Sequence, residues 1–217
     1  MAILPDTILT PGLSAVRVSP ECAVVPNVLT DLLFSAVKNE AARFAAVRSG
    51  TIGRKSGAVP YSALQGSVLA GVYGHSQMIQ LVERVVGETG LVPLPEGNEL
   101  ACSLLVYENP GDRIGYHYDR NHYQGKTFTV LYTVVNNGSS SLVPSSNRTC
   151  VWTDRERCLA TQPNSVFIMN GSEVLHSAKP LGDMERRVVL SMVYTTDPSQ
   201  TLLQAARQRV KNWSFGF

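Results

Sequence analysis

The spacing of apolar residues changes near the middle of the chain. In the first half, residues 28–47 (VLTDLLFSAVKNEAARFAAV) and 76–86 carry apolar side chains at the intervals of an amphipathic helix. Ser76 is a suitable N-cap for the second segment, and Gly87 is a suitable residue to end it. We therefore predict that residues 1–99 form mainly supporting helices and loops.

A segment rich in glycine and serine separates these two helices. Residues 48–67 read RSGTIGRKSGAVPYSALQGS and contain G-x-x-G-x-K-S instead of the G-x-x-x-x-G-K-[ST] of a phosphate-binding loop. No clear strand precedes the segment, although such a loop requires one. We expect a mobile loop here, which could fold over a pocket as a lid, and not a nucleotide site.

From Leu100 the pattern becomes that of short strands. Stretches rich in β-branched and aromatic residues alternate with Gly, Pro, Asn and Ser turns. These stretches are ACSLLVYEN (101–109), KTFTVLYTVVNN (126–137), TCVWTD (149–154), NSVFIMNG (164–171) and RRVVLSMVYTT (186–196). A series of this kind predicts an all-β second half, as in a jelly roll or a barrel.

The end of the chain returns to a helical pattern. The stretch SQTLLQAARQRVKNW places five residues on one apolar side: Leu202, Leu203, Ala206, Val210 and Trp213. We expect one α+β domain over residues 1–217, with helices packed outside a β-barrel. Its expected parts are helical support and loops in 1–99, a jelly-roll core in 100–196 and a C-terminal helix in 197–217.

Composition narrows the class of protein. The contents of 44% hydrophobic and 17% charged residues are typical of a soluble globular protein, and a net charge of +2 does not indicate a nucleic-acid or membrane partner. No apolar run reaches the length of a membrane span, and the N-terminus lacks the pattern of a secretory signal. The four cysteines (Cys22, Cys102, Cys150 and Cys158) form no CxxC pair. We expect free thiols and a cytoplasmic protein, with the redox state of the last two left open because they flank a predicted hairpin turn.

Chemically active residues cluster at 114–125, IGYHYDRNHYQG. If residues 116–119 form a strand, His117 and Asp119 project from the same face and can chelate one ion. His176, near the end of a later strand segment, is a candidate third ligand. Two histidines and one carboxylate with open coordination positions form the triad of non-haem Fe(II) oxygenases. The HxD pair alone also fits a buried, hydrogen-bonded pair without a metal.

Two adjacent arginines open the strand segment MERRVVLSMVY at 184–194. An arginine that points into an apolar barrel needs an anion, because an unpaired buried charge is very costly. A dicarboxylate ligand is a candidate, since a guanidinium binds a carboxylate through two hydrogen bonds. The alternative is that the arginines are solvated at the rim, and we expect this for one of them.

In this order of HxD pair, later histidine and arginine, the sequence resembles the Fe(II)/2-oxoglutarate-dependent dioxygenases and is most similar to their prolyl 4-hydroxylase-like branch. The resemblance covers about residues 100–196. Four segments carry it: LLVYENPGDRIGYHYD (104–119), KTFTVLYTVVNN (126–137), QPNSVFIMNGSEVLHSAKPL (162–181) and RRVVLSMVY (186–194). Four matches in sequence order are more specific than any one of them.

The resemblance implies a double-stranded β-helix, which is a jelly-roll or cupin-like barrel, with Fe(II) in its mouth. His117, Asp119 and His176 would hold the iron. The co-substrates would be 2-oxoglutarate and O2, and ascorbate is a candidate accessory reductant.

The resemblance also implies which residues bind 2-oxoglutarate. Arg187 would bind its far carboxylate, with Arg186 as the fallback because a one-residue shift reverses the faces of a strand. Tyr107 would hydrogen-bond the keto-acid end, and Thr133 would assist at the distal carboxylate.

The expected substrate is a small amino-acid-like metabolite whose unactivated C–H bond is oxidised, with a prolyl residue in a peptide as the alternative. The small molecule is favoured because no additional peptide-binding module is visible. Family members that halogenate have a small residue in place of Asp119, so the carboxylate favours hydroxylation, desaturation or ring formation. Candidate substrate contacts are Tyr116, Asn121, His122 and Trp152, with Arg54 and Lys55 if the predicted loop folds over.

Two other functions compete with this interpretation. Nucleic-acid demethylation is disfavoured because the region around Val193, where that branch carries a second arginine, is apolar and no basic groove is evident. A non-catalytic, cupin-like metal-binding protein would use the histidines structurally or to hold zinc.

Overall fold

The computed structural model describes residues 3–51, 54–138, 142–145 and 161–214. Within these ranges, 12 strands pair in one antiparallel sheet. Along the sheet the order is β1 (Val16–Ser19), β2 (Cys22–Val25), β10 (Ser165–Met169), β8 (Thr127–Asn136), β12 (Arg187–Thr195), β6 (Cys102–Tyr107), β4 (Arg54–Val59), β7 (Arg113–His117), β11 (Leu175–Ala178) and β9 (Leu142–Ser145). Off this path, β3 (Val47–Thr51) pairs with β4, and β5 (Val92–Pro93) pairs with β12.

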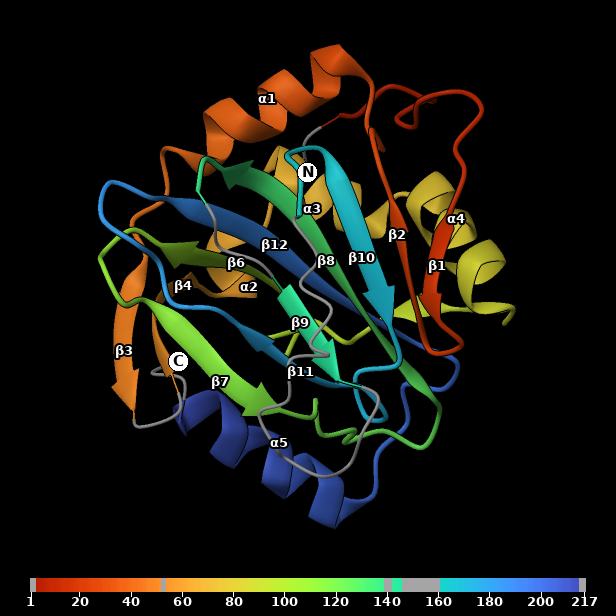
Figure 1. The fold of residues 1–217 in the computed structure, drawn as a ribbon. Helices are drawn as coiled ribbons and strands as arrows, with labels where there is room; N and C mark the ends of the chain where they lie inside the picture. Colours follow the sequence, from red (N-terminus) through yellow and green to blue (C-terminus); the bar gives the residue numbers. More distant parts are fainter. Residues whose placement is uncertain (1–2, 52–53, 139–141, 146–160, 215–217) are drawn as a thin grey trace.

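The sheet curls into a half-barrel. Figure 1 shows the end that contains β7, β11 and β9 passing in front of the part formed by β8 and β12. This arrangement confirms the jelly-roll fold class expected from the sequence. The curl leaves an inner face, which lines a cavity, and an outer face, which is covered by helices.

The helices of the first half build the main core against the outer face. They are α1 (Asp31–Ala41), α2 (Tyr61–Leu64), α3 (Val68–Gly74) and α4 (Ser76–Val86) (Figure 1). Alternate residues of β8, Val130, Tyr132 and Val134, are fully buried in one cluster with apolar residues of all four helices. Thr129 and Leu131, which alternate with these residues, project to the cavity side, as the two-residue repeat of a strand requires.

The first half contains more strand than its pattern predicts. The helix expected over 28–47 covers only α1, and β3 begins at Val47. The segment expected to be a mobile loop forms the β3–β4 hairpin followed by α2. The expectation of mainly helices and loops in residues 1–99 did not include the five short strands β1 to β5 that lie there.

Tertiary pairing explains this difference. Strand β4 pairs with both β6 and β7, so its backbone groups are bonded inside the sheet whatever its local composition. Its glycine fits that position: a Cβ on Gly57 would lie 2.8 Å from the Cβ of Ala46.

Other predicted elements are confirmed. Helix α4 begins at Ser76 and ends before Gly87, whose φ of 75° is left-handed. Its N-cap is His75, whose Nδ1 accepts a hydrogen bond from the backbone N–H of Gln77, and not Ser76. The C-terminal helix is α5 (Leu202–Ser214), which lies beside β7 and away from α1 (Figure 1). The assignment of the whole chain to one domain stays a prediction.

The cysteine prediction can be followed for two of the four residues. Cys22 and Cys102 are buried free thiols, and burial raises the pKa of both. Cys150 and Cys158 lie outside the described residues. None of the helices that the structure describes is long and apolar enough to cross a bilayer.

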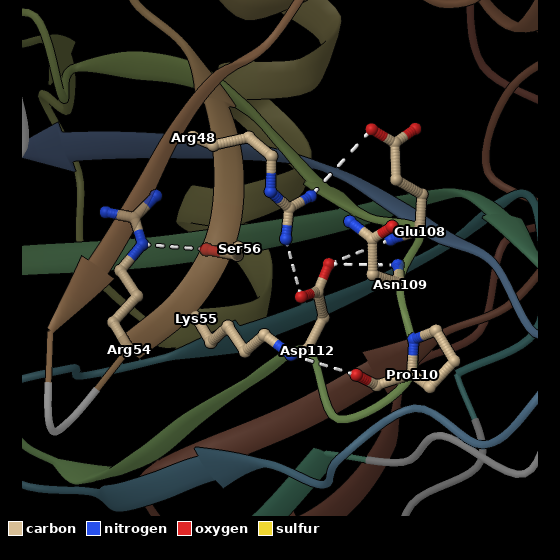
Figure 2. A network of polar contacts seen from close by, with 8 residues as sticks. All are labelled: Arg48, Arg54, Lys55, Ser56, Glu108, Asn109, Pro110 and Asp112. Carbon is tan, nitrogen blue, oxygen red and sulfur yellow. Dashed lines mark hydrogen bonds and ion pairs between the residues drawn. The ribbon is translucent and has the colours of Figure 1, made fainter.

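A buried carboxylate ties the β3–β4 hairpin to the turn between β6 and β7 (Figure 2). Asp112 is fully buried, and its Oδ1 accepts a hydrogen bond from Nη2 of Arg48 at 2.7 Å. Its Oδ2 accepts the backbone N–H groups of Glu108 and Asn109, each at 3.1 Å. Burial alone would raise the pKa of Asp112, but these hydrogen bonds and the Arg48 charge lower it below its usual value. The hairpin that brings Arg54 to the barrel is held in place through this carboxylate.

Replacing this carboxylate should destabilise the protein in a pH-dependent way. We expect Asp112→Asn to lower the free energy of unfolding by about 2 kcal/mol at neutral pH, because a charged acceptor of three hydrogen bonds is lost. Since the folded-state pKa is depressed, the difference should be complete above about pH 4 and vanish as the pH falls through the folded-state value. Urea unfolding followed by circular dichroism measures both, with Asp183→Asn at an exposed site as the control. A difference that persists undiminished in acid would contradict the assignment.

Candidate metal centre and cavity

The pairing of β7 with β11 brings two histidines together. His117 is the last residue of β7 and lies directly opposite His176 of β11 in the antiparallel register. Opposed residues project from the same face of a sheet, and the two imidazole centroids are 4.2 Å apart. Two of the three metal ligands expected from the sequence are thus neighbours.

Asp119 completes the group from just beyond the strand. Because β7 ends at His117, Asp119 does not lie on a strand, as the sequence argument assumed. Its backbone N–H donates to the carbonyl of Gly171 at 2.8 Å, which holds the loop against the barrel. Its Oδ1 is 3.5 Å from Nε2 of His117, and its Oδ2 is 3.9 Å from Nε2 of His176. Ligand atoms of the three residues all lie within 4.8 Å of one another.

The hydrogen bonds of the two rings indicate that Nε2 is the nitrogen that would bind a metal. Nδ1 of His117 is 2.9 Å from the carbonyl oxygen of Gly115, and Nδ1 of His176 is 2.9 Å from that of Val174. A carbonyl only accepts, so each Nδ1 carries the proton and each Nε2 presents its lone pair. Metal-binding histidines are commonly oriented by a bond of this kind.

The pKa shifts of Asp119 and His176 also favour the binding of a cation. Burial would raise the pKa of Asp119, but the two imidazoles and the hydroxyl of Thr129, which donates to Oδ2 at 2.7 Å, hold that pKa well below its usual range. Burial lowers the pKa of His176, and the neighbouring His117 lowers it further. The Asp119 carboxylate acts in the opposite direction but does not cancel this effect. Metal binding needs an ionised carboxylate and neutral imidazoles, and these shifts favour the ionised form of Asp119 and the neutral form of His176. Two nitrogens and one carboxylate oxygen fit a ferrous ion.

The three residues lie on the wall of a cavity of about 1060 Å³ between the inner face of the sheet and α5. Most residues that the sequence assigned to a site line it. They are His117, Asp119, His176, Arg187, Tyr107, Tyr116, Asn121, His122 and Arg54. Arg186, Thr133 and Lys55 are not among its described lining residues, and Trp152 lies outside the described part of the chain.

The strand register selects between the two arginines. Arg187 lies opposite Tyr107 in the β12–β6 pair, and its guanidinium carbon is 4.3 Å from the centroid of the Tyr107 ring. Arg187 is 4% exposed, and the Tyr107 hydroxyl is buried without a hydrogen-bond partner in the described ranges. Arg186 precedes the strand and is only half-buried. A guanidinium and a phenol therefore face the cavity together.

The expected contact of Thr133 gains no support. Thr133 has the strand parity of Thr129 and Leu131, but it is 1% exposed and does not line the cavity. The register of the β12–β8 pair shifts beside it, because Val188 lies opposite Val135 and Val189 lies opposite Thr133.

The candidate substrate contacts differ in what their side chains do. The Asn121 amide donates to the carbonyl of Gly125 and accepts the N–H of Tyr123, so it shapes its own loop. Arg54 is buried with its Nε donating to Ser56 Oγ at 2.8 Å, whereas the exposed Lys55 donates to a backbone carbonyl of the β6–β7 turn (Figure 2).

Helix α5 borders the cavity with Gln204, Arg207 and Gln208 and with two residues of its predicted apolar side, Ala206 and Val210. The apolar side expected to pack is exposed: Leu202 is 93%, Leu203 59% and Val210 64% exposed. Gln208 is instead buried, and its Nε2 donates to Oδ1 of Asn98 at 2.9 Å. Gln204 and Gln208 are four residues apart, so they lie on one side of the helix. This spacing was the available signal for the buried side, but the prediction followed the apolar residues.

Two further residues that the sequence argument missed position the carboxylate of Asp119. Thr129 donates to Asp119, and Gly171 leaves room for it: a Cβ at 171 would lie 2.5 Å from Oδ2 of Asp119 and 2.8 Å from Oγ1 of Thr129. The glycine of the MNG turn after β10 was the visible signal of a close approach.

Filling this space should displace the carboxylate without unfolding the protein. We expect Gly171→Ala to weaken Ni(II) or Co(II) binding about tenfold or more, because Asp119 must move away from the two histidines. Calorimetric metal titration measures the effect. Gly74→Ala, where a Cβ meets nothing within 4 Å, is the control. Unchanged metal affinity in Gly171→Ala would show that Asp119 is not held as described.

No protein-family model matches the sequence, and no curated protein is similar to it in sequence. Solved structures do share its fold. The α-ketoglutarate-dependent non-haem epimerase SnoN of nogalamycin biosynthesis aligns with a TM-score of 0.64 and 17% identity over 81% of this chain and 76% of that chain. A Pseudomonas putida prolyl-4-hydroxylase aligns with a TM-score of 0.57 and 14% identity over 81% and 91%.

A third similar structure is HygX from Streptomyces hygroscopicus, solved with nickel and 2-oxoglutarate bound. It aligns with a TM-score of 0.63 and 12% identity over 81% of this chain and 82% of that chain. At these identities the likeness concerns the fold. The chain has the curled antiparallel sheet of the 2-oxoglutarate/Fe(II) oxygenases, as the sequence resemblance predicted.

Proposed function

We propose that this chain is an Fe(II)- and 2-oxoglutarate-dependent oxygenase that oxidises a C–H bond of a small molecule. The observation that carries the proposal is the cluster of His117, Asp119 and His176, whose ligand atoms lie within 4.8 Å of one another on a cavity wall. Arg187 lies in the same cavity, on a strand of the same sheet. The cluster and the guanidinium together fit a metal and a dicarboxylate.

Each of these residues has a defined task in the proposal. The two Nε2 atoms and the Asp119 carboxylate hold the ion, while the carbonyls of Gly115 and Val174 keep the rings in place. A bound ferrous ion with 2-oxoglutarate and O2 supplies oxidative decarboxylation, which yields succinate and CO2 and drives C–H oxidation.

The protein orients the keto acid through two neighbouring side chains. Arg187 binds the far carboxylate, and its stacking on Tyr107 restricts the guanidinium to one direction. The buried Tyr107 hydroxyl donates to the keto-acid end. Leu105, Ile114 and Leu131 are apolar parts of the cavity wall and exclude water from the reacting centre.

A small molecule is the favoured substrate over a prolyl peptide. Helix α5 borders the cavity, and we infer that it restricts access for an extended chain. Among the similar structures, SnoN was solved with nogalamycin RO and HygX with hygromycin B, whereas a Trichoplax adhaerens prolyl hydroxylase was solved with a peptide fragment. The amino-acid-like metabolite expected from the sequence is one member of the favoured class.

The proposed activity predicts a spectroscopic and a chemical signal. Fe(II) and 2-oxoglutarate added without oxygen should produce a visible charge-transfer band, because the keto acid chelates the ion. Admitting air should then convert 2-oxoglutarate to succinate, measured by mass spectrometry. His176→Ala should lose both signals. A wild-type protein that shows neither band nor succinate would instead be a non-catalytic metal-binding protein.

The register of β12 predicts a sharp difference between neighbouring arginines. We expect Arg187→Ala to weaken 2-oxoglutarate binding by about tenfold or more while sparing Ni(II) binding, because a buried charge-assisted hydrogen bond is lost. Arg186→Ala, with the same change of charge one residue earlier, is the matched control and should leave both affinities unchanged. Titration calorimetry measures them, and the reverse pattern would place Arg186 in the site.

A further inference from the structure

The cavity wall carries more positive charge than the proposed co-substrate requires. Four arginines line it: Arg54, Arg120, Arg187 and Arg207. Among the described lining residues, Asp119 is the sole acid. In the proposed function Arg187 binds 2-oxoglutarate and Asp119 binds the metal, so three arginines remain for the rest of the cavity.

Two of these arginines lie at the solvent-facing side of the cavity. Arg120 follows the candidate ligand Asp119 in the loop after β7, and Arg207 lies on α5, so the two belong to different elements that border one cavity. Both are exposed, and the side chain of neither forms an ion pair or a hydrogen bond within the part of the chain that the structure describes. Their donors are thus available to a ligand.

Arg54 adds a charge deeper in the cavity. It is 7% exposed, and its bond to Ser56 fixes the direction of the side chain. Burial lowers its pKa, but a guanidinium stays protonated at neutral pH, so the charge persists inside the barrel. Positive charge is therefore present both at the mouth of the cavity and in its interior.

Much of the remaining lining is apolar, and the cavity is large. Leu94, Leu100, Val189 and Val193 are among the residues that supply this surface. A volume of about 1060 Å³ lies at the upper end of cavities that hold drug-sized ligands. It can accommodate 2-oxoglutarate together with a substrate larger than a free amino acid.

We propose that the substrate is an organic anion with an apolar body, and that Arg120 and Arg207 bind its oxyanion group at the mouth of the cavity. A carboxylate, sulfate or phosphate group is the chemistry that a guanidinium recognises through paired hydrogen bonds. The inference rests on the proposed function, because it assigns Arg187 and Asp119 to the co-substrate and the metal. It makes Arg120 and Arg207 residues that determine substrate specificity.

Two fluorescent probes test the preference for an anion directly. 1-Anilinonaphthalene-8-sulfonate and N-phenyl-1-naphthylamine share one aromatic body, and only the first carries a sulfonate. Each is titrated into protein saturated with Ni(II) and 2-oxoglutarate, so that turnover is absent and Arg187 is occupied. We expect the sulfonate probe to bind more tightly. Arg120→Gln and Arg207→Gln should each weaken it by about threefold or more and leave the neutral probe unchanged.

Matched controls localise the effect. Arg113→Gln on β7 and Arg209→Gln on α5 remove the same charge from the same two regions at exposed positions that do not line the cavity. Both controls should bind the sulfonate probe like the wild type. Near-UV circular dichroism verifies that every variant retains its packing.

The outcomes separate this inference from the proposed function. Equal affinity for the two probes, or equal losses in the cavity variants and their controls, overturns the assignment of an anion site. Calorimetry on the same samples reports Ni(II) and 2-oxoglutarate binding. If neither Ni(II) nor 2-oxoglutarate binds, the proposed function is rejected. The comparison of the two probes on the same protein still decides whether the cavity prefers an anion.

Discussion

The antiparallel register between β7 and β11 is the constraint on which the candidate site depends. Because side chains alternate along a strand, a shift of one residue in β11 would turn His176 away and place Leu175 or Ser177 opposite His117. Strand β11 is bonded on its other edge to β9, where His176 lies opposite Pro144. With both edges paired, the register is held from two sides. The two imidazoles are therefore positioned by backbone hydrogen bonds before any ligand contributes.

The two faces of the curled sheet have separate tasks, and β8 shows how one strand serves both. Val130 and Tyr132 join the helices in the core, while Thr129 projects to the cavity and donates to Asp119. Burial of apolar surface on the outer face stabilises the strand that presents polar groups on the inner face. Close packing leaves little freedom near the carboxylate, and Gly171 is required there because a Cβ would overlap Asp119.

Helix α5 is hydrogen-bonded to the rest of the protein through glutamines, and its amphipathic pattern did not predict these contacts. Gln208 is 6% exposed and bonds Asn98, and Gln204 donates to the carbonyl of Tyr123. Buried polar groups need hydrogen-bond partners, and amide side chains can satisfy a donor and an acceptor at once. Gln204 and Gln208 therefore attach the helix at the edge of the cavity by hydrogen bonds, while Leu202 is 93% exposed. The same helix brings Arg207 to the cavity.

The sequence by itself determined the features that depend on local periodicity and on residue type. It predicted α4, the strands β6, β8, β10 and β12, the jelly-roll class and the residues that meet as His117, Asp119 and His176. The strand expected over 149–154 lies outside the described residues. Only the tertiary structure decided that residues 48–67 form a hairpin and a short helix, and that Arg187 and not Arg186 reaches the cavity. The physical reason is that pairing between strands distant in sequence satisfies backbone hydrogen bonds and sets which face each side chain takes. Local patterns do not contain that information.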